Sequence, residues 1–357
     1  MDQFNVYKDM KARTNGEIYI GVVGPVRTGK STFIKRFMNL MVLPNIEDEN
    51  DRNRANDELP QSSSGKTIMT TEPKFVPNEA VSIKTEEGIE LNVRLIDCVG
   101  YMVEGATGHM EGEEERLVKT PWFDYEIPFT KAAAIGTKKV ITEHSTIGVV
   151  VTCDGSFGEI AAKQYEPAEE ETIKQLKALK KPFVVLLNTI HPYSESTKQL
   201  AAEKEEKYQT KVLPMNLEQM KKEDIYEIIK SVLMEFPISS IGFYVPRWTE
   251  MLKKDHPLKM ELLQMARDVI TEKTTMRDIY EEQEKEYEYI TGQKLESVAM
   301  DSGEVVITVK VGDVYYYEFL SETTGMEIRN EYEFIKIMGE LAKKRKSTKK
   351  LEKHWRQ

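Results

Sequence analysis

The sequence predicts an α/β fold over residues 1–239, with a mostly parallel sheet flanked by helices, and a smaller α+β domain over residues 240–357. Two observations support this prediction. In the first part of the chain, short apolar runs alternate with helix-like segments, as expected of buried parallel strands joined by right-handed helical crossovers. From Pro237 to Pro246 the composition changes, and a strongly charged stretch follows before new strand and helix patterns begin.

The expected elements follow from the spacing of apolar residues. In the first domain the expected strands span residues 17–24, 74–76, 89–97, 146–152 and 182–188. Its expected helices span residues 30–42, 169–180 and 225–236. In the second domain we expect a helix within residues 261–288, a strand over 304–317 and a helix over 331–343.

The composition restricts the classes of partner. The chain has 357 residues and a formal net charge of −10, so the phosphate backbone of a nucleic acid would repel it and no nucleic-acid partner is expected. Cys98 and Cys153 lie in apolar runs and are expected to be buried and reduced, which fits an intracellular protein. No stretch approaches the length of a membrane-spanning helix, so membrane contact is expected only peripherally or through a partner.

The end of the sequence is basic. Residues 343–357 contain eight Lys or Arg and one Glu, a local charge of +7, so the rest of the chain carries −17. Two interpretations stay open: the tail binds an acidic surface or molecule, or it is a solvated helix end or a frayed terminus.

Residues 24–31, Gly-Pro-Val-Arg-Thr-Gly-Lys-Ser, match the phosphate-binding pattern G-x-x-x-x-G-K-[ST]. Its glycines let several backbone N–H groups point at one phosphate group, and the following helix adds its positive N-terminal end. Lys30 is expected to reach the β- and γ-phosphates, and Ser31 to place its hydroxyl on Mg²⁺. The alternative is a plain strand-to-helix turn. The residues expected to contact nucleotide are Gly24, Arg27, Thr28, Gly29, Lys30, Ser31, Thr32 and Asn188.

Asp97 ends an apolar strand-like run, and Gly100 follows in the order D-x-x-G. An acid at the carboxyl end of a strand beside the phosphate loop is expected to hold Mg²⁺ directly or through water. Between the two motifs, Thr70 and Thr71 are expected to close over Mg²⁺ and the γ-phosphate, and Thr71 is expected to be a metal ligand. The alternatives are an ordinary turn at Asp97 and a plain β-rich loop at the threonines. Lys30, Thr70, Thr71 and Asp97 form the expected catalytic set.

Two expected motifs are absent. GTP-binding proteins carry N-K-x-D after a later strand, whereas this chain reads Asn188-Thr189-Ile190-His191. A neutral imidazole cannot accept the two guanine N–H bonds that the aspartate accepts, so ATP is the expected nucleotide. Tyr101 follows Gly100 where small GTPases commonly have a glutamine that orients the attacking water. We therefore expect slow hydrolysis that rises on self-assembly.

Longer runs resemble one family, the stage IV sporulation protein A family of endospore-forming bacteria. They include residues 43–46 (LPNI), 57–61 (DELPQ), 65–77 (GKTIMTTEPKFVP) and 143–150 (EHSTIGVV), with a weaker match at 325–329 (GMEIR). The resemblance implies a P-loop NTPase with a GTPase-like fold that uses ATP and Mg²⁺. It makes Lys30 the phosphate-loop lysine, Asp97 the metal-site aspartate, and Thr70 and Thr71 the sensing threonines.

The resemblance also implies a cellular role and partners. ATP hydrolysis in the family drives assembly into a static homopolymer, the basement layer of the spore coat. That layer lies at the forespore surface in the mother-cell cytoplasm. The implied partners are a small amphipathic membrane-bound sporulation peptide and other coat proteins. The family continues with a further domain linked to peptide docking, whereas this sequence ends at Gln357, so both peptide docking and full coat assembly are expected to be affected.

Two other classes of function remain open. One is a GTP-binding switch protein, against which His191 and Tyr101 both argue. The other is a scaffold that binds nucleotide without hydrolysing it.

Overall fold

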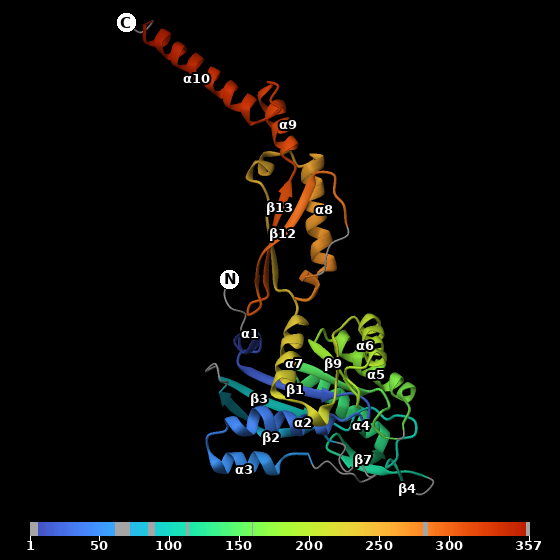
Figure 1. Ribbon diagram of the computed structural model, residues 1–357. Coiled ribbons are helices and arrows are strands. Elements are labelled where there is room, and N and C mark those ends of the chain that lie inside the picture. The colour runs from blue at the N-terminus through green and yellow to red at the C-terminus, as the bar shows by residue number, and fades with distance from the viewer. Residues whose placement is uncertain are drawn as a thin grey trace. The chain divides into compact units, whose positions relative to one another are not determined.

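The computed structural model describes residues 6–60, 72–84, 90–111, 114–158, 160–280 and 285–354 (Figure 1). Thr70 and Thr71 lie outside these ranges. By their internal contacts the residues form two compact units. The first consists of Met1–Ile238, Thr275–Tyr280 and Met300–Gly303, and the second of Ser239–Thr274, Glu281–Ala299 and Glu304–Gln357.

The first unit is built on a six-stranded sheet with the order β10-β9-β8-β1-β3-β2. Five strands are parallel, and β2 alone pairs antiparallel, with β3 at the edge. The mixed α/β fold with a mostly parallel sheet is therefore confirmed. The strands are β1 (Glu17–Val23), β2 (Lys74–Lys84), β3 (Glu90–Asp97), β8 (Ile147–Cys153), β9 (Phe183–Asn188) and β10 (Val212–Met215).

Helices flank this sheet, as Figure 1 shows. They are α1 (Val6–Arg13), α2 (Lys30–Phe37), α3 (Glu49–Asp57), α4 (Phe129–Lys139), α5 (Ala162–Ala178), α6 (Glu195–Tyr208) and α7 (Lys222–Met234). Two short hairpins, β4–β5 (Met110–Glu111, Glu114–Glu115) and β6–β7 (Leu117–Thr120, Phe123–Pro128), precede α4. The helix expected over residues 30–42 changes at Met38 into a π-helical turn that ends at Val42.

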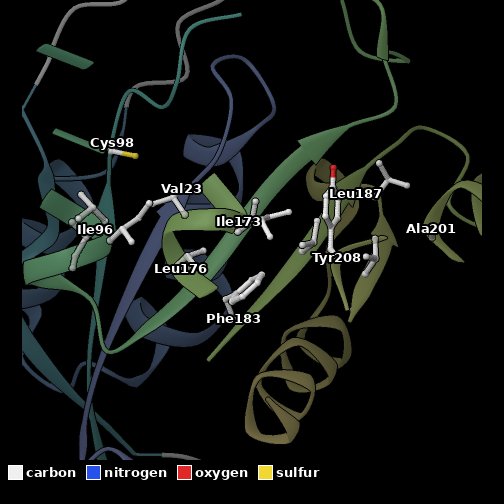
Figure 2. Close-up of a cluster of buried hydrophobic side chains, with 14 residues drawn as sticks. Val23, Ile96, Cys98, Ile173, Leu176, Phe183, Leu187, Ala201 and Tyr208 are labelled. Atoms are coloured by element: carbon white, nitrogen blue, oxygen red, sulfur yellow. The ribbon is translucent and has the colours of Figure 1, made fainter. Parts of the chain in front are cut away.

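The packing of the core of this unit explains why the sequences of β8 and β9 are continuously apolar. Every residue of β8 and β9 is buried. Ile173 and Leu176 of α5 pack with Phe183 and Leu187 of β9, and Figure 2 shows these side chains in one cluster. Strands covered on both faces read as continuous apolar runs, which is why the sequence revealed them. Both cysteines are free and buried, as expected.

The second unit contains a three-stranded sheet, β11-β13-β12. Its elements are β11 (Ser240–Tyr244), α8 (Pro257–Glu272), β12 (Ile290–Ala299), β13 (Glu304–Val311), α9 (Asp313–Thr324) and α10 (Glu331–His354). The helix expected within residues 261–288 ends at Glu272. The helix expected over 331–343 continues to His354, so the basic residues up to that point are helical.

The prediction of a strand over residues 304–317 is wrong at its carboxyl end. It stops at Val311, and Tyr315, Tyr316 and Tyr317 lie in α9. The ring centroids of Tyr316 and Phe319, one helical turn apart, lie 5.6 and 5.5 Å from that of Trp248. This aromatic packing favours a helix over the strand preference of a tyrosine run. Within the described ranges, none of the helices combines the length and the apolar composition needed to cross a membrane.

Candidate functional site

The candidate site lies at the carboxyl ends of the parallel strands. From β1 the chain goes first to β2 and β3 on one side and later to β8 on the other, which makes β1 the strand where the order reverses. Ligands of open α/β sheets bind in the crevice outside this reversal. The residues following β1 form the 24–31 loop, while Asp97 ends β3 and Asn188 ends β9. The topology therefore brings these three sequence-predicted positions to one edge.

The 24–31 loop is folded tightly between β1 and α2. Gly24 has a φ of +125°, and a Cβ atom there would lie 2.5 Å from the carbonyl oxygen of Val151. The Val26 N–H donates to the carbonyl of Tyr101 at 3.0 Å, and the Thr28 hydroxyl donates to the carbonyl of Pro25 at 3.0 Å. Since α2 begins at Lys30, its first N–H groups face the loop without partners inside the helix. Thr32 lies half-buried in that first turn.

Lys30 is buried, with 5% of its surface exposed. Its ammonium group donates to the carbonyl oxygens of Gly24, at 3.5 Å, and Pro25. Burial lowers the pKa of Lys30, and the nearby Cys98 and Asp97 oppose that shift. A buried cation held by loop carbonyls can exchange those weak acceptors for an anionic oxygen, which is a stronger acceptor.

Ser31 and Asp97 form the second part of the site. The Ser31 hydroxyl donates to Oδ2 of Asp97 at 3.0 Å. The other carboxylate oxygen, Oδ1, is buried and has no hydrogen-bond partner among the described residues. Burial raises the pKa of Asp97, while the charge of Lys30 opposes this rise. An unsatisfied carboxylate oxygen beside a hydroxyl is a donor set that suits Mg²⁺, so these residues fit the ion expected from the sequence.

Gly100 and Tyr101 pack against the 24–31 loop. The Tyr101 N–H donates to the carbonyl of Gly24 at 3.2 Å. The Tyr101 side chain packs against a cluster of buried residues that includes Val26, Val103 and Tyr165. Burial raises the pKa of Tyr101 to about 12. The side chain at the position of the expected glutamine is thus part of the core packing.

Asn188 connects three segments. Its Nδ2 donates to the carbonyl of Thr28 at 3.0 Å, and its Oδ1 accepts from the N–H of Leu217 at 3.2 Å. Both ends of the amide are used inside the protein, so Asn188 positions the 24–31 loop. Thr189 is buried, and its hydroxyl accepts a hydrogen bond from the N–H of His191. His191 itself is exposed.

Two residues near this edge, Asp154 and Ser156, were not predicted from the sequence. Asp154 follows β8 directly and accepts hydrogen bonds from the N–H, at 2.9 Å, and the hydroxyl of Ser156. That hydroxyl in turn accepts from the N–H of Ile190 at 3.1 Å. The rule that identified Asp97, an acid at the carboxyl end of a parallel strand, also identifies Asp154.

A lysine, a serine and an aspartate brought together by a glycine-containing loop at this edge are typical of nucleotide-binding proteins. Two family models match the chain. The model described as stage IV sporulation protein A, ATPase domain, matches residues 1–237, and the model of the middle domain matches residues 238–357. The chain therefore belongs to the stage IV sporulation protein A family, whose ATPase domain indicates nucleotide binding and a function in sporulation.

Relatives support this assignment along nearly the whole chain. The chain is 45% identical to stage IV sporulation protein A of Bacillus anthracis, over 96% of its own length and 70% of that protein. It is 46% identical to the Clostridioides difficile protein of the same name, over 98% and 71%, and 44% identical to that of Bacillus subtilis, over 96% and 70%. Among solved structures, a variant of SsGBP aligns over 62% of this chain and 58% of that chain, with 16% identity and a TM-score of 0.34, which is too low to support an argument.

Proposed function

We propose that this chain is an ATP-hydrolysing structural protein that assembles into the basement layer of the bacterial spore coat. Its first domain, residues 1–239, would be a P-loop NTPase, and residues 240–357 a smaller α+β domain. The observation that carries the proposal is the grouping of Lys30, Ser31 and Asp97, in which one buried carboxylate oxygen has no hydrogen-bond partner among the residues that the structure describes. The match to the ATPase domain model supports it independently.

In the proposed reaction the 24–31 loop binds the phosphates of ATP. Lys30 turns its ammonium group from the loop carbonyls to the β- and γ-phosphate oxygens, and the first N–H groups of α2 donate to the same anion. Ser31 and Asp97 would hold Mg²⁺, which when bound would neutralise charge on the phosphates. Thr70 and Thr71 are proposed to order over the triphosphate, and Thr71 to complete the metal site.

ATP is proposed as the nucleotide because the chain lacks the guanine-reading acid. In the Asn-Thr-Ile-His segment after β9, the amide of Asn188 is occupied by Thr28 and Leu217. The Thr189 hydroxyl is occupied by the N–H of His191. No carboxylate stands in this segment to accept the two N–H bonds of guanine.

Assembly and partners are proposed from the family. The chain would pair with copies of itself, and with a small amphipathic membrane-bound sporulation peptide and other coat proteins, at the forespore surface in the mother-cell cytoplasm. Nucleic acid is not a proposed partner, because the net charge is −10. Contact with a membrane would be peripheral and through such partners.

The test combines phosphate release with sedimentation of the purified chain. We expect the chain to release phosphate from ATP and to sediment with ATP, and the Lys30→Ala variant to do neither. A non-hydrolysable ATP analogue shows whether binding alone drives assembly. Turnover of GTP well above that of ATP would favour the GTP-binding switch. Binding of ATP without phosphate release would favour the non-hydrolysing scaffold and overturn the enzyme.

A further inference from the structure

Arg27 stands apart from its neighbours in the 24–31 loop. Val26 and Thr28 are each 1% exposed, whereas Arg27 is exposed. The backbone of Val26 is fixed by Tyr101, and Thr28 is fixed through both its hydroxyl and its carbonyl. The loop therefore holds the backbone of Arg27 on both sides, while its long cationic side chain stays exposed.

The backbone of Arg27 adopts a rare conformation. Its φ is +62°, in the left-handed region that costs a non-glycine residue about 1–2 kcal/mol. Such residues persist where the surroundings determine them, and they are concentrated at functional sites. A glycine would adopt this φ without strain. The chain instead has an arginine at this position, so the strain accompanies a guanidinium group in the middle of the loop.

The guanidinium of Arg27 binds the segment that follows Gly100. Its Nη2 donates to the hydroxyl of Thr107 at 2.9 Å and to the carbonyl of the same residue at 3.2 Å. Thr107 belongs to the stretch that begins with Asp97 at the metal site and passes through Tyr101. Arg27 thus links the loop expected to hold the phosphates to the segment expected to hold the metal.

Hydrolysis of a triphosphate requires stabilisation of the charge that develops on its phosphate oxygens. Tyr101 cannot share this task through its side chain, which packs against the buried cluster of Val26, Val103 and Tyr165. A planar guanidinium with several fixed donors is well suited to phosphate oxygens. Arg27 is the exposed arginine within the loop that is proposed to bind these oxygens.

We propose that Arg27 is a catalytic residue that stabilises the charge developing on the phosphates during ATP hydrolysis, with Thr107 as its positioning residue. This rests on the function proposed above. In the reaction, the water oxygen bonds to the terminal phosphorus, and the bond from that phosphorus to the bridging oxygen breaks. The electron pair leaves with the diphosphate. One water proton stays on the released phosphate and the other passes to the medium.

The test separates binding from chemistry. For Arg27→Ala we expect kcat to fall on the order of 10³-fold. Binding of a fluorescent non-hydrolysable ATP analogue should stay within about threefold, because Lys30 and the loop backbone remain. Capture of ADP with aluminium fluoride, which mimics the charge of the transferring group, should be lost. Lys35→Ala, which removes an exposed cation from α2, is the control and should match the parent chain.

Each outcome decides the matter. If Arg27→Ala turns over ATP within about threefold of the parent and still captures ADP with aluminium fluoride, the assignment of Arg27 is wrong while the proposed ATPase stands. If the parent chain itself binds ATP but releases no phosphate, the proposed enzyme fails first. The role proposed for Arg27 then fails as well, because it requires an active parent chain. The two failures are distinguishable, since the parent chain releases phosphate in the first case and not in the second.

A second variant tests the role of Thr107. Thr107→Val keeps the shape of the side chain and removes the hydroxyl that accepts from Arg27. We expect it to lower kcat about tenfold in the parent chain, and not at all in the Arg27→Ala background, because it acts only through Arg27. Equal effects of Thr107→Val in both backgrounds would show that Thr107 acts independently and would overturn its positioning role.

Discussion

Gly100 touches both parts of the candidate site. Its φ is +93°, and a Cβ atom there would lie 2.2 Å from the carbonyl oxygen of Gly24 and 2.6 Å from Nζ of Lys30. The first contact is with backbone that is held by β1 and Tyr101, so it cannot move aside easily. Gly100 therefore sets how closely the segment after β3 approaches the 24–31 loop.

We expect Gly100→Ala to destabilise the chain by about 2–4 kcal/mol in urea denaturation, from strain in φ and from the overlap with Gly24. Nucleotide binding should weaken with it. Gly105→Ala is a matched control, because Gly105 has a φ of +87° and its nearest atoms, on Gln164, lie 3.9 Å from a Cβ. It should show only the strain, about 1–2 kcal/mol. Equal losses in the two variants would rule out the overlap.

The single residues that sequence reasoning found are those with a fixed spacing. Lys30 and Ser31 follow from the eight-residue pattern, and Asp97 from its place at the end of a strand. The structure brings Ser31 and Asp97 within hydrogen-bond distance. The bond between Arg27 and Thr107 spans 80 positions and follows no pattern, so it had no sequence signal. The roles of all these residues in chemistry stay predictions, as do those of Thr70 and Thr71.

At the scale of elements, Asn188 holds the loop, β9 and the turn at Leu217 together. Asn188→Ala would leave the carbonyl of Thr28 and the N–H of Leu217 buried without partners, since these residues are 1% and 0% exposed. We expect a loss of about 2–3 kcal/mol in urea denaturation and weaker binding of an ATP analogue.

Two further variants sharpen this test. Asn188→Asp has nearly the same shape and can still accept from Leu217, but it cannot donate to Thr28, so it should also weaken binding. Asn216→Ala removes an acceptor for the N–H of Glu218 in the same turn, and should cost only about 1 kcal/mol without changing nucleotide affinity. An unchanged affinity in Asn188→Ala would mean that the loop keeps its geometry without this amide.

Elements were predictable where one physical cause dominated. The parallel strands β8 and β9 are buried on both faces, and their apolar runs are continuous. The end of β13 was not predictable, because Trp248, far away in sequence, packs on Tyr316 and Phe319 and turns that run into a helix. The π-helical turn after α2 has no distinct composition either. Tertiary packing determines the secondary structure of these segments, and local propensity carries no information about that packing.

At the scale of the whole molecule, the units do not follow the order of the chain. The family models divide it between residues 237 and 238, yet Thr275–Tyr280 and Met300–Gly303 belong to the first unit by their contacts. The N–H of Arg277 donates to the carbonyl of Met234 at 2.8 Å, and its Nη2 donates to the carbonyl of Gln209 at 2.9 Å. The change of composition along the sequence predicts one boundary between domains, and it cannot show that two later segments belong to the first unit.

Arg277 provides a measurable consequence of this arrangement. Its Nη1 lies 3.3 Å from Oε1 of Glu235, whose side chain is 8% exposed. Burial raises the pKa of Glu235, and the charge of Arg277 opposes that rise. Arg277→Met removes the opposing charge, so the pKa of Glu235 should rise further. A carboxyl whose folded-state pKa is raised stabilises the fold at low pH, and this stability is lost as pH rises through the folded-state pKa.

We therefore expect Arg277→Met to destabilise the first unit by about 2 kcal/mol at about pH 8, and by much less at about pH 5. Amide hydrogen exchange of β8 and β9 measures this, because both strands lie in the core of that unit. Adding Glu235→Gln to Arg277→Met removes the buried charge and should abolish the pH dependence. A loss that is equal at both pH values would mean that the packing of Arg277, and not its charge, connects the later segment to the first unit.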